Sequence, residues 1–175
     1  MAADPLFFEG LDDFAFPLTV APSTTDYHTA IRDAIVTTLT PILAGYANLT
    51  VKALEDVDSD IKTIDLPAVT VICIGPEQDR AELTTNAQDG LGYACLVSLL
   101  SHGVTAGEKS PGVPSMTLFR RIVHTAFHDK RLTGITQVCW CEVSAAGPIY
   151  DKDSPAFQKL QSAVVVTAIG RFPRS

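Results

Sequence analysis

The chain has 175 residues, 46% of them hydrophobic and 19% charged, and a net charge of −7. This length fits one domain with a sizeable core, and the acidic balance argues against a nucleic-acid reader, which needs basic residues to neutralise phosphates. No apolar run approaches the roughly 20 residues needed to cross a bilayer, and the first residues lack the basic start of a signal peptide. We therefore expect synthesis in the cytoplasm and no membrane contact.

Residues 1–24 form a distinct segment, which we expect to be an extended N-terminal arm. Acidic residues and prolines alternate there with four of the eight phenylalanines, Phe7, Phe8, Phe14 and Phe16. The prolines disfavour regular structure, yet the segment is too apolar for an ordinary disordered tail. Its rings should cover a surface, either on their own domain or on an adjacent subunit. Residues 25–175 should form a single α+β domain.

The first expected helix starts near residue 27. Apolar side chains from Tyr27 to Leu39 recur at the helical spacing of three and four. Residues 23–26 offer several N-cap side chains. Pro41 should kink or end the helix, and Gly45 indicates a stop near there.

Three strands and two loops should follow this helix. Residues 49–54 alternate between apolar and polar side chains, and residues 66–75 are rich in β-branched side chains between Pro and Gly. Residues 76–90 are polar and acidic, which favours a long hairpin loop. Residues 91–101 should return as a strand, and a glycine-rich loop is expected at 103–112.

A second helix should open at Pro114 and Ser115. Its expected apolar stripe consists of Leu118, Phe119, Ile122, Val123, Ala126 and Phe127, with the basic residues on the opposite side. Strands are predicted at 136–144 and 158–169. The whole order predicts an α+β fold, in which two helices pack on one face of a mainly antiparallel or mixed sheet of about five strands.

The four cysteines, Cys73, Cys95, Cys139 and Cys141, all lie in strand-like runs. They are expected to be buried, reduced thiols. The alternation of a strand would turn Cys139 and Cys141 to the same side.

Catalytic and cofactor motifs are missing from the sequence. No nucleophile motif or phosphate-binding loop occurs, and the aspartates at 56, 58 and 60 lack the glycine and glutamate of a calcium loop. His124 and His128 lie one helical turn apart, but a solvated helix face explains them better than a metal site. We therefore expect a protein that is not an enzyme and that holds no cofactor and no metal.

The order of elements and several short stretches resemble the tail terminator and neck proteins of tailed bacteriophages. The resemblance covers roughly residues 25–172. It is carried by a helix at 27–43, a strand with Leu66-Pro67-Ala68-Val69, a helix ending Phe127-His128-Asp129, a strand with Cys141-Glu142-Val143 before Gly147-Pro148-Ile149-Tyr150-Asp151, and a final strand at 162–171.

This resemblance implies a structural virion protein of the neck. Family members form a ring, commonly a homohexamer, which caps the tail tube and joins it to the head connector or stopper protein. The ring can also meet the sheath protein, and DNA passes through it without specific binding. A ring subunit needs contacts that close by rotation, and the candidate contact residues are Phe7, Phe8, Phe14, Phe16, Arg120, Arg121, Arg171, Phe172 and Arg174.

Two alternatives stay open at this point. The chain could be another head–tail connector, stopper or tail-completion protein. It could instead be a small cytoplasmic ligand-binding domain or enzyme, for which His28, His102, His124 and Cys95 would supply the reactive groups.

Overall fold

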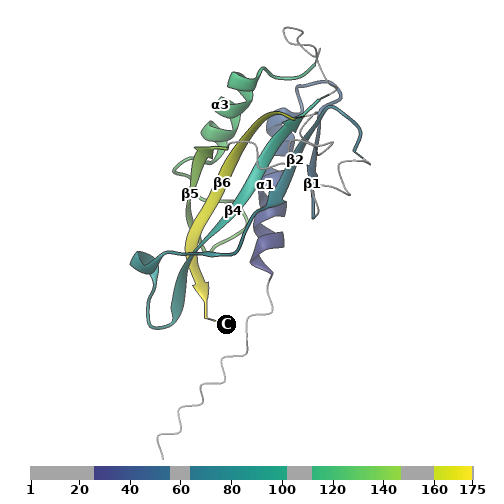
Figure 1. Ribbon diagram of the computed structural model, residues 1–175. Helices are drawn as coiled ribbons and strands as arrows, with labels where there is room; N and C mark the ends of the chain where they lie inside the picture. The colour runs from purple at the N-terminus through teal and green to yellow at the C-terminus, as the bar shows by residue number, and fades with distance from the viewer. Residues whose placement is uncertain (1–25, 56–63, 102–111, 147–159, 175) are drawn as a thin grey trace, which may run out of the picture.

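The computed structural model describes residues 26–55, 64–101, 112–146 and 160–174 (Figure 1). The expected arm and nearly all of the 103–112 loop lie outside these residues, as do the aspartates at 56, 58 and 60. The elements in chain order are α1 Tyr27–Leu43, β1 Thr50–Ala53, β2 Ala68–Cys73, β3 Gln78–Asp79, the 3₁₀ helix η2 Ala81–Leu83, β4 Gln88–Leu100, α3 Met116–Phe127, β5 Val138–Ala145 and β6 Leu160–Pro173.

The strands form one mixed sheet, so the expected α+β fold is confirmed. Their order is β1-β2-β4-β6-β5, and the short β3 pairs with β4. β1 and β2 are parallel, whereas every other pairing is antiparallel. Both helices pack against the same face of the sheet through one hydrophobic cluster (Figure 1).

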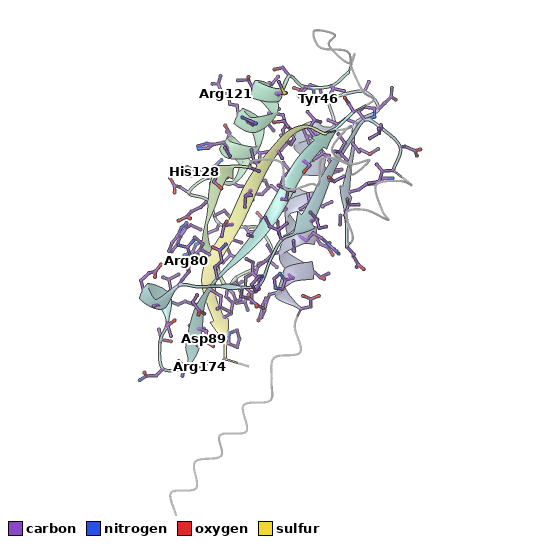
Figure 2. All side chains as sticks on the ribbon, in the orientation of Figure 1. Tyr46, Arg80, Asp89, Arg121, His128 and Arg174 are labelled. Carbon is purple, nitrogen blue, oxygen red and sulfur yellow. The ribbon has the colours of Figure 1, made fainter. Side chains whose placement is uncertain are left out.

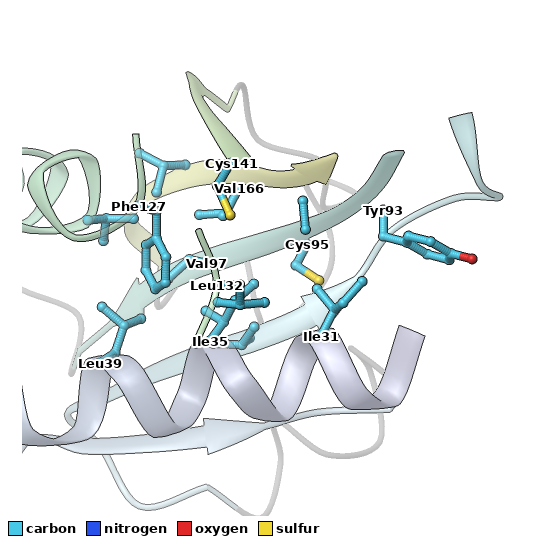
Figure 3. Packing of buried hydrophobic residues seen from close by; sticks show 14 of the residues in the cluster. Ile31, Ile35, Leu39, Tyr93, Cys95, Val97, Phe127, Leu132, Cys141 and Val166 are labelled. Carbon is cyan, nitrogen blue, oxygen red and sulfur yellow. The ribbon is translucent and has the colours of Figure 1, made fainter. Parts of the chain in front are cut away.

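The first helix, α1, follows the predicted periodicity closely. Asp26 is its N-cap and accepts a hydrogen bond from the Thr29 amide. One residue per turn is buried: Ile31, Ile35, Leu39 and Leu43. Figure 3 shows the first three pointing from α1 to the sheet, where Cys95 and Val97 of β4 meet them.

The second helix, α3, begins at the expected cap but buries a narrower stripe than predicted. The Ser115 side chain accepts from the Leu118 amide, and Phe119, Val123 and Phe127 are buried. Leu118, which we expected in the buried stripe, is 42% exposed. It lies about 100° around the helix from Phe119, so it falls on the flank of α3 and not on the face towards the sheet.

The opposite face of the sheet carries a second, smaller cluster. It contains Ile72 of β2, Leu96 and Leu100 of β4, and Ala163 of β6, together with Leu54 after β1. Because successive side chains of a strand alternate between faces, Cys95 and Val97 join the larger cluster under the helices. The central strands are therefore buried on both faces.

The segment predicted as a long loop at 76–90 is more ordered than expected. Gln78 pairs with Gly92 and Asp79 with Leu91, and β4 already begins at Gln88. A Cβ atom on Gly90 would lie 2.2 Å from the Arg80 backbone oxygen. A close backbone approach at glycine thus lets the polar segment fold back onto β4.

The last strand is longer than predicted, and β5 contains a bulge. β6 extends to Pro173, past the expected end at residue 169, because β4 pairs with it as far as Gln88. The bulge lies between Val138 and Trp140. Cys141 therefore enters the core cluster while Cys139 does not, and the prediction that both thiols share a side is wrong. An inserted residue shifts the alternation of a strand by one position.

Candidate functional site

The surface carries a groove between the end of α1 and the flank of α3, which we call the α1–α3 groove. It encloses about 350 Å³ and is lined by Ile42, Leu118, Arg121, Ile122, Thr125, Ala126 and Lys130. Of these described residues two are cationic and none is acidic. The groove therefore combines an apolar floor with a positive rim.

Exposed large hydrophobic side chains concentrate at this groove. Among the described residues they are Ile42, Met116 and Leu118, which are 45%, 56% and 42% exposed. Two of them line the groove, and Met116 lies in the first turn of the same helix. Scattered apolar residues on a surface need no explanation, but a contiguous patch with a polar rim marks an interaction site.

The predicted interface arginines of α3 have different surroundings. Arg121 lines the groove and makes no ion pair within the described part of the chain. Arg120 turns to β6, where its Nε donates to the Ser162 hydroxyl at 3.0 Å. Lys130, at the far side of the groove, donates through Nζ to the Thr125 backbone oxygen. Arg121 is thus the cation best placed to meet another molecule.

Arg174, one of the predicted C-terminal contact residues, lies at the other end of the molecule from Arg121 (Figure 2). Phe172 is only 1% exposed, and its ring centroid lies 4.8 Å from those of Tyr27 and Tyr93. Arg174 Nε donates to Asp89 Oδ1 at 2.9 Å. Arg171 is exposed. We therefore remove Phe172 from the candidate interface, because its side chain fills the core of its own chain.

A second chemical feature is a pair of facing thiols. Cys73 and Cys95 are direct partners across β2 and β4, and their sulfur atoms are 3.2 Å apart. The hydrogen bond with Cys95 lowers the pKa of Cys73 to about 7, against the opposing effect of burial. The same bond, together with burial, raises the pKa of Cys95. Cys73 is half-buried and is thus the accessible, more acidic thiol of the pair.

The histidines considered for an enzyme do not form one site. The His28 ring packs edge-on against Tyr93, with centroids 4.8 Å apart. The ring of His124, in the last turn of α3, stacks on that of His128, the C-cap of the same helix, with centroids 4.2 Å apart. His128 also accepts a hydrogen bond from the Val143 amide, at 3.3 Å from its Nδ1, which joins the helix end to β5. His102 lies outside the described residues.

The described residues contain neither a metal-binding cluster nor a membrane-spanning helix. Within the described ranges, no group of three or more His, Cys, Asp or Glu side chains is arranged to hold a metal ion. No helix in the described part of the chain is long and apolar enough to cross a membrane.

Sequence reasoning missed the groove and the thiol pair. The six apolar residues of α3 spread over too wide an arc to form one buried face. Leu118 lies at the side of this arc and is therefore exposed. Ile42 follows Pro41 near the end of the helix. The proline is a stop signal and does not indicate that the next side chain lines a groove. The Cys73–Cys95 contact depends on the register of two strands separated by a long connection, and no local signal reports it.

Comparisons with known proteins find similarity to solved structures. No protein-family model matches the chain, and no curated protein matches it. Nine chains of solved structures match. One is the sheath/tube terminator of PVC, an extracellular contractile injection system, in its extended state, with a TM-score of 0.46 and 8% identity. The match covers 82% of this chain and 56% of that one, so this chain spans little more than half of the neighbour's length.

Proposed function

We propose that this chain is a structural, non-enzymatic ring subunit of a phage neck, and that it acts as the tail terminator. In this role copies of the chain form a ring on the head-proximal end of the tail tube. The ring stops tube growth and offers its other face to the head connector, and in a contractile tail it also contacts the sheath. The working surfaces of such a protein are interfaces between subunits.

The observation that carries this proposal is the α1–α3 groove. Two apolar residues of the groove, Ile42 and Leu118, are each more than two-fifths exposed to solvent in the single chain. Covering a large aliphatic side chain is worth about 1.5–3 kcal/mol, so a partner that fills this groove gains binding energy. Arg121 and Lys130 at its rim add a charge preference.

The order of elements gives independent support. The sequence resemblance rests on a helix, a strand, a second helix and two closing strands, and α1, β2, α3, β5 and β6 occur at the expected places. The two helices cover one face of the sheet. Among the described residues the edge strand β1 has one neighbour, β2, in the sheet order, so this edge of the sheet is a further surface for contact.

A tube-capping assay tests the proposal. The purified protein is mixed with growing tail tubes of the same virus, and the tubes are measured by negative-stain electron microscopy. A terminator produces a cap at one tube end and stops elongation in proportion to its concentration. Tubes that elongate normally and carry no cap would refute the terminator role. Binding to isolated head connectors without binding to tubes would also refute it, in favour of a stopper.

A further inference from the structure

The α1–α3 groove lacks an occupant among the described residues, while the sequence holds a segment that complements it. Residues 1–24 contain four phenylalanines and four acidic residues, and neither lysine nor arginine. The groove has an apolar floor, which suits the phenylalanines of this segment. Its cations, Arg121 and Lys130, are opposite in charge to the segment's acidic residues. We propose that residues 1–24 of a second copy of this chain dock in the α1–α3 groove.

The apolar fit is the first argument. Ile42, Leu118 and Ile122 come from two helices and converge on one hollow of about 350 Å³. Pockets that hold compact ligands begin near 300 Å³, so the hollow accepts one or two aromatic side chains but not a folded domain. A peptide segment with phenylalanines close together, such as Phe7 and Phe8 or Phe14 and Phe16, matches this size.

The charge fit is the second argument. The α3 helix contains Arg120 and Arg121 and no acidic residue, and Arg121 makes no ion pair within the described residues. The arm carries Asp4, Glu9, Asp12 and Asp13. Opposite charges at the rim of an apolar contact select the partner and fix its orientation.

The arm and the groove lie at opposite ends of α1, and the proposed ring favours a second copy as the donor. The arm joins the domain at Asp26, next to Tyr27, whose ring lies 4.8 Å from that of Phe172. The groove opens at the other end of α1, beside Ile42, about 25 Å away for a helix of 17 residues. Figure 1 shows the start of α1 and the C-terminus at the same end of the molecule.

Donor and acceptor at opposite ends of a subunit create a head-to-tail contact. Such heterologous contacts close into a ring when the rotation between copies allows it. A fully extended segment of 24 residues spans at most roughly 80 Å, which is enough to reach a neighbour. This inference rests on the proposed ring function and specifies which surfaces join the subunits.

The test is a photo-cross-link in the full-length protein. Phe8 is replaced by p-benzoylphenylalanine, and equal amounts of ¹⁵N-labelled and unlabelled chains are assembled, irradiated and analysed by mass spectrometry. We expect cross-links to peptides that contain Ile42 or residues of α3, with one labelled and one unlabelled partner. Cross-links that form only within one chain, that fall on another surface or partner, or that do not form would each overturn the inference.

A pair of matched variants gives the second readout. Leu118→Asp places a charge in the groove and should lower the cross-link yield at least about tenfold, because one buried leucine is worth that much in affinity. Thr117→Asp adds the same charge to an exposed neighbouring position that does not line the groove, and should leave the yield unchanged. Equal yields in both variants would contradict the docking site. Ile42→Asp replaces Leu118→Asp if circular dichroism shows that the latter is unfolded.

The tube-capping assay separates this inference from the function on which it rests. Protein that caps tubes but cross-links elsewhere retains its role and loses this interface. Protein that shows the predicted cross-link but never caps a tube retains the interface and loses the terminator role.

Discussion

At the scale of single residues, the thiol pair shows how a contact between strands changes chemistry. Cys73 has its sulfur 3.2 Å from that of Cys95 and 3.1 Å from the backbone oxygen of His28. The carbonyl accepts a hydrogen bond from the protonated thiol, whereas Cys95 can donate to the thiolate. The bond from Cys95 is the larger influence and lowers the pKa of Cys73 to about 7. When the pair has lost one of its two protons, the remaining proton therefore stays on Cys95.

This arrangement predicts an unusual pH dependence of alkylation. Cys73 should react with iodoacetamide at half its maximal rate near pH 7, because the thiolate is the nucleophile and its pKa is lowered to about 7. Replacing the donor, in Cys95→Ala, should move this midpoint upwards by a unit or more towards the ordinary value near 8.5. Cys139→Ala is the control and should leave it unchanged. The midpoint is read by peptide mass spectrometry, and an ordinary midpoint in the unaltered protein would contradict the donation from Cys95 to the thiolate.

At the scale of secondary-structure elements, α1 depends on its cap. Asp26 accepts hydrogen bonds from the Thr29 amide at 3.2 Å and from the Thr29 hydroxyl at 2.6 Å. Asp26→Ala should lower the free energy of unfolding at pH 7 by about 1 kcal/mol. Asp26→Asn keeps a capping oxygen and should lower the free energy of unfolding by less. Both values come from urea unfolding monitored by circular dichroism.

The cap also predicts a pH effect. The hydrogen bond from the Thr29 side chain is the main cause that lowers the pKa of Asp26 below 3.8. A carboxyl group whose pKa is lower in the folded than in the unfolded state stabilises the fold at pH values above its unfolded-state pKa. This stabilisation is lost as the pH falls through the folded-state pKa. The stability difference between the unaltered chain and Asp26→Ala should therefore narrow below about pH 4. A difference that stays constant down to pH 2 would mean that the charge of Asp26 has no part in capping.

The junction of β5 and β6 depends on one glycine. A Cβ atom on Gly170 would lie 2.1 Å from the Gln137 backbone oxygen, which also accepts from the Arg171 amide at 3.0 Å. Gly170→Ala should cost about 1–3 kcal/mol of unfolding free energy, because backbone must move to admit the methyl group. Gly45→Ala is the matched control, since no atom lies within 4 Å of the added carbon. Equal urea midpoints for the two variants would contradict this close approach.

The elements differ in how well the sequence predicts them. Both helices could be located from the sequence because their signals are local: Asp26 and Ser115 cap them, and apolar residues repeat at helical spacing. The positions of the strands were also predictable, but their pairing was not. The bulge at Cys139 and the pairing of β3 with β4 arise from contacts between distant segments. These contacts decide which side chains face the core.

The candidate interface was predictable only in part, for the same reason. The sequence pointed to the basic side of α3, and Arg121 does line a groove. It could not show that Arg120 bonds Ser162 in its own chain or that Phe172 fills the core. Both outcomes depend on where β6 lies relative to the helices. Whether a surface residue is free to bind thus depends on tertiary contacts that sequence spacing does not encode.

At the scale of the whole molecule, the two arginines should have separable roles. Arg121→Glu reverses the charge at the groove and should weaken association of copies by at least tenfold while leaving the thermal midpoint of the monomer unchanged. Arg120→Glu removes the bond to Ser162 and should lower stability by about 1 kcal/mol. Sedimentation velocity and thermal unfolding measure the two effects. Association that is insensitive to Arg121→Glu would place the contact elsewhere.

The central claim is that copies of this chain assemble into a closed ring, and native mass spectrometry of the concentrated full-length protein tests it most directly. We expect one dominant species at six times the 18.7 kDa mass of the chain, which dissociates in Arg121→Glu and Leu118→Asp but persists in Thr117→Asp. A protein that remains monomeric at every concentration, both alone and with tail tubes, would contradict the ring and the function built on it.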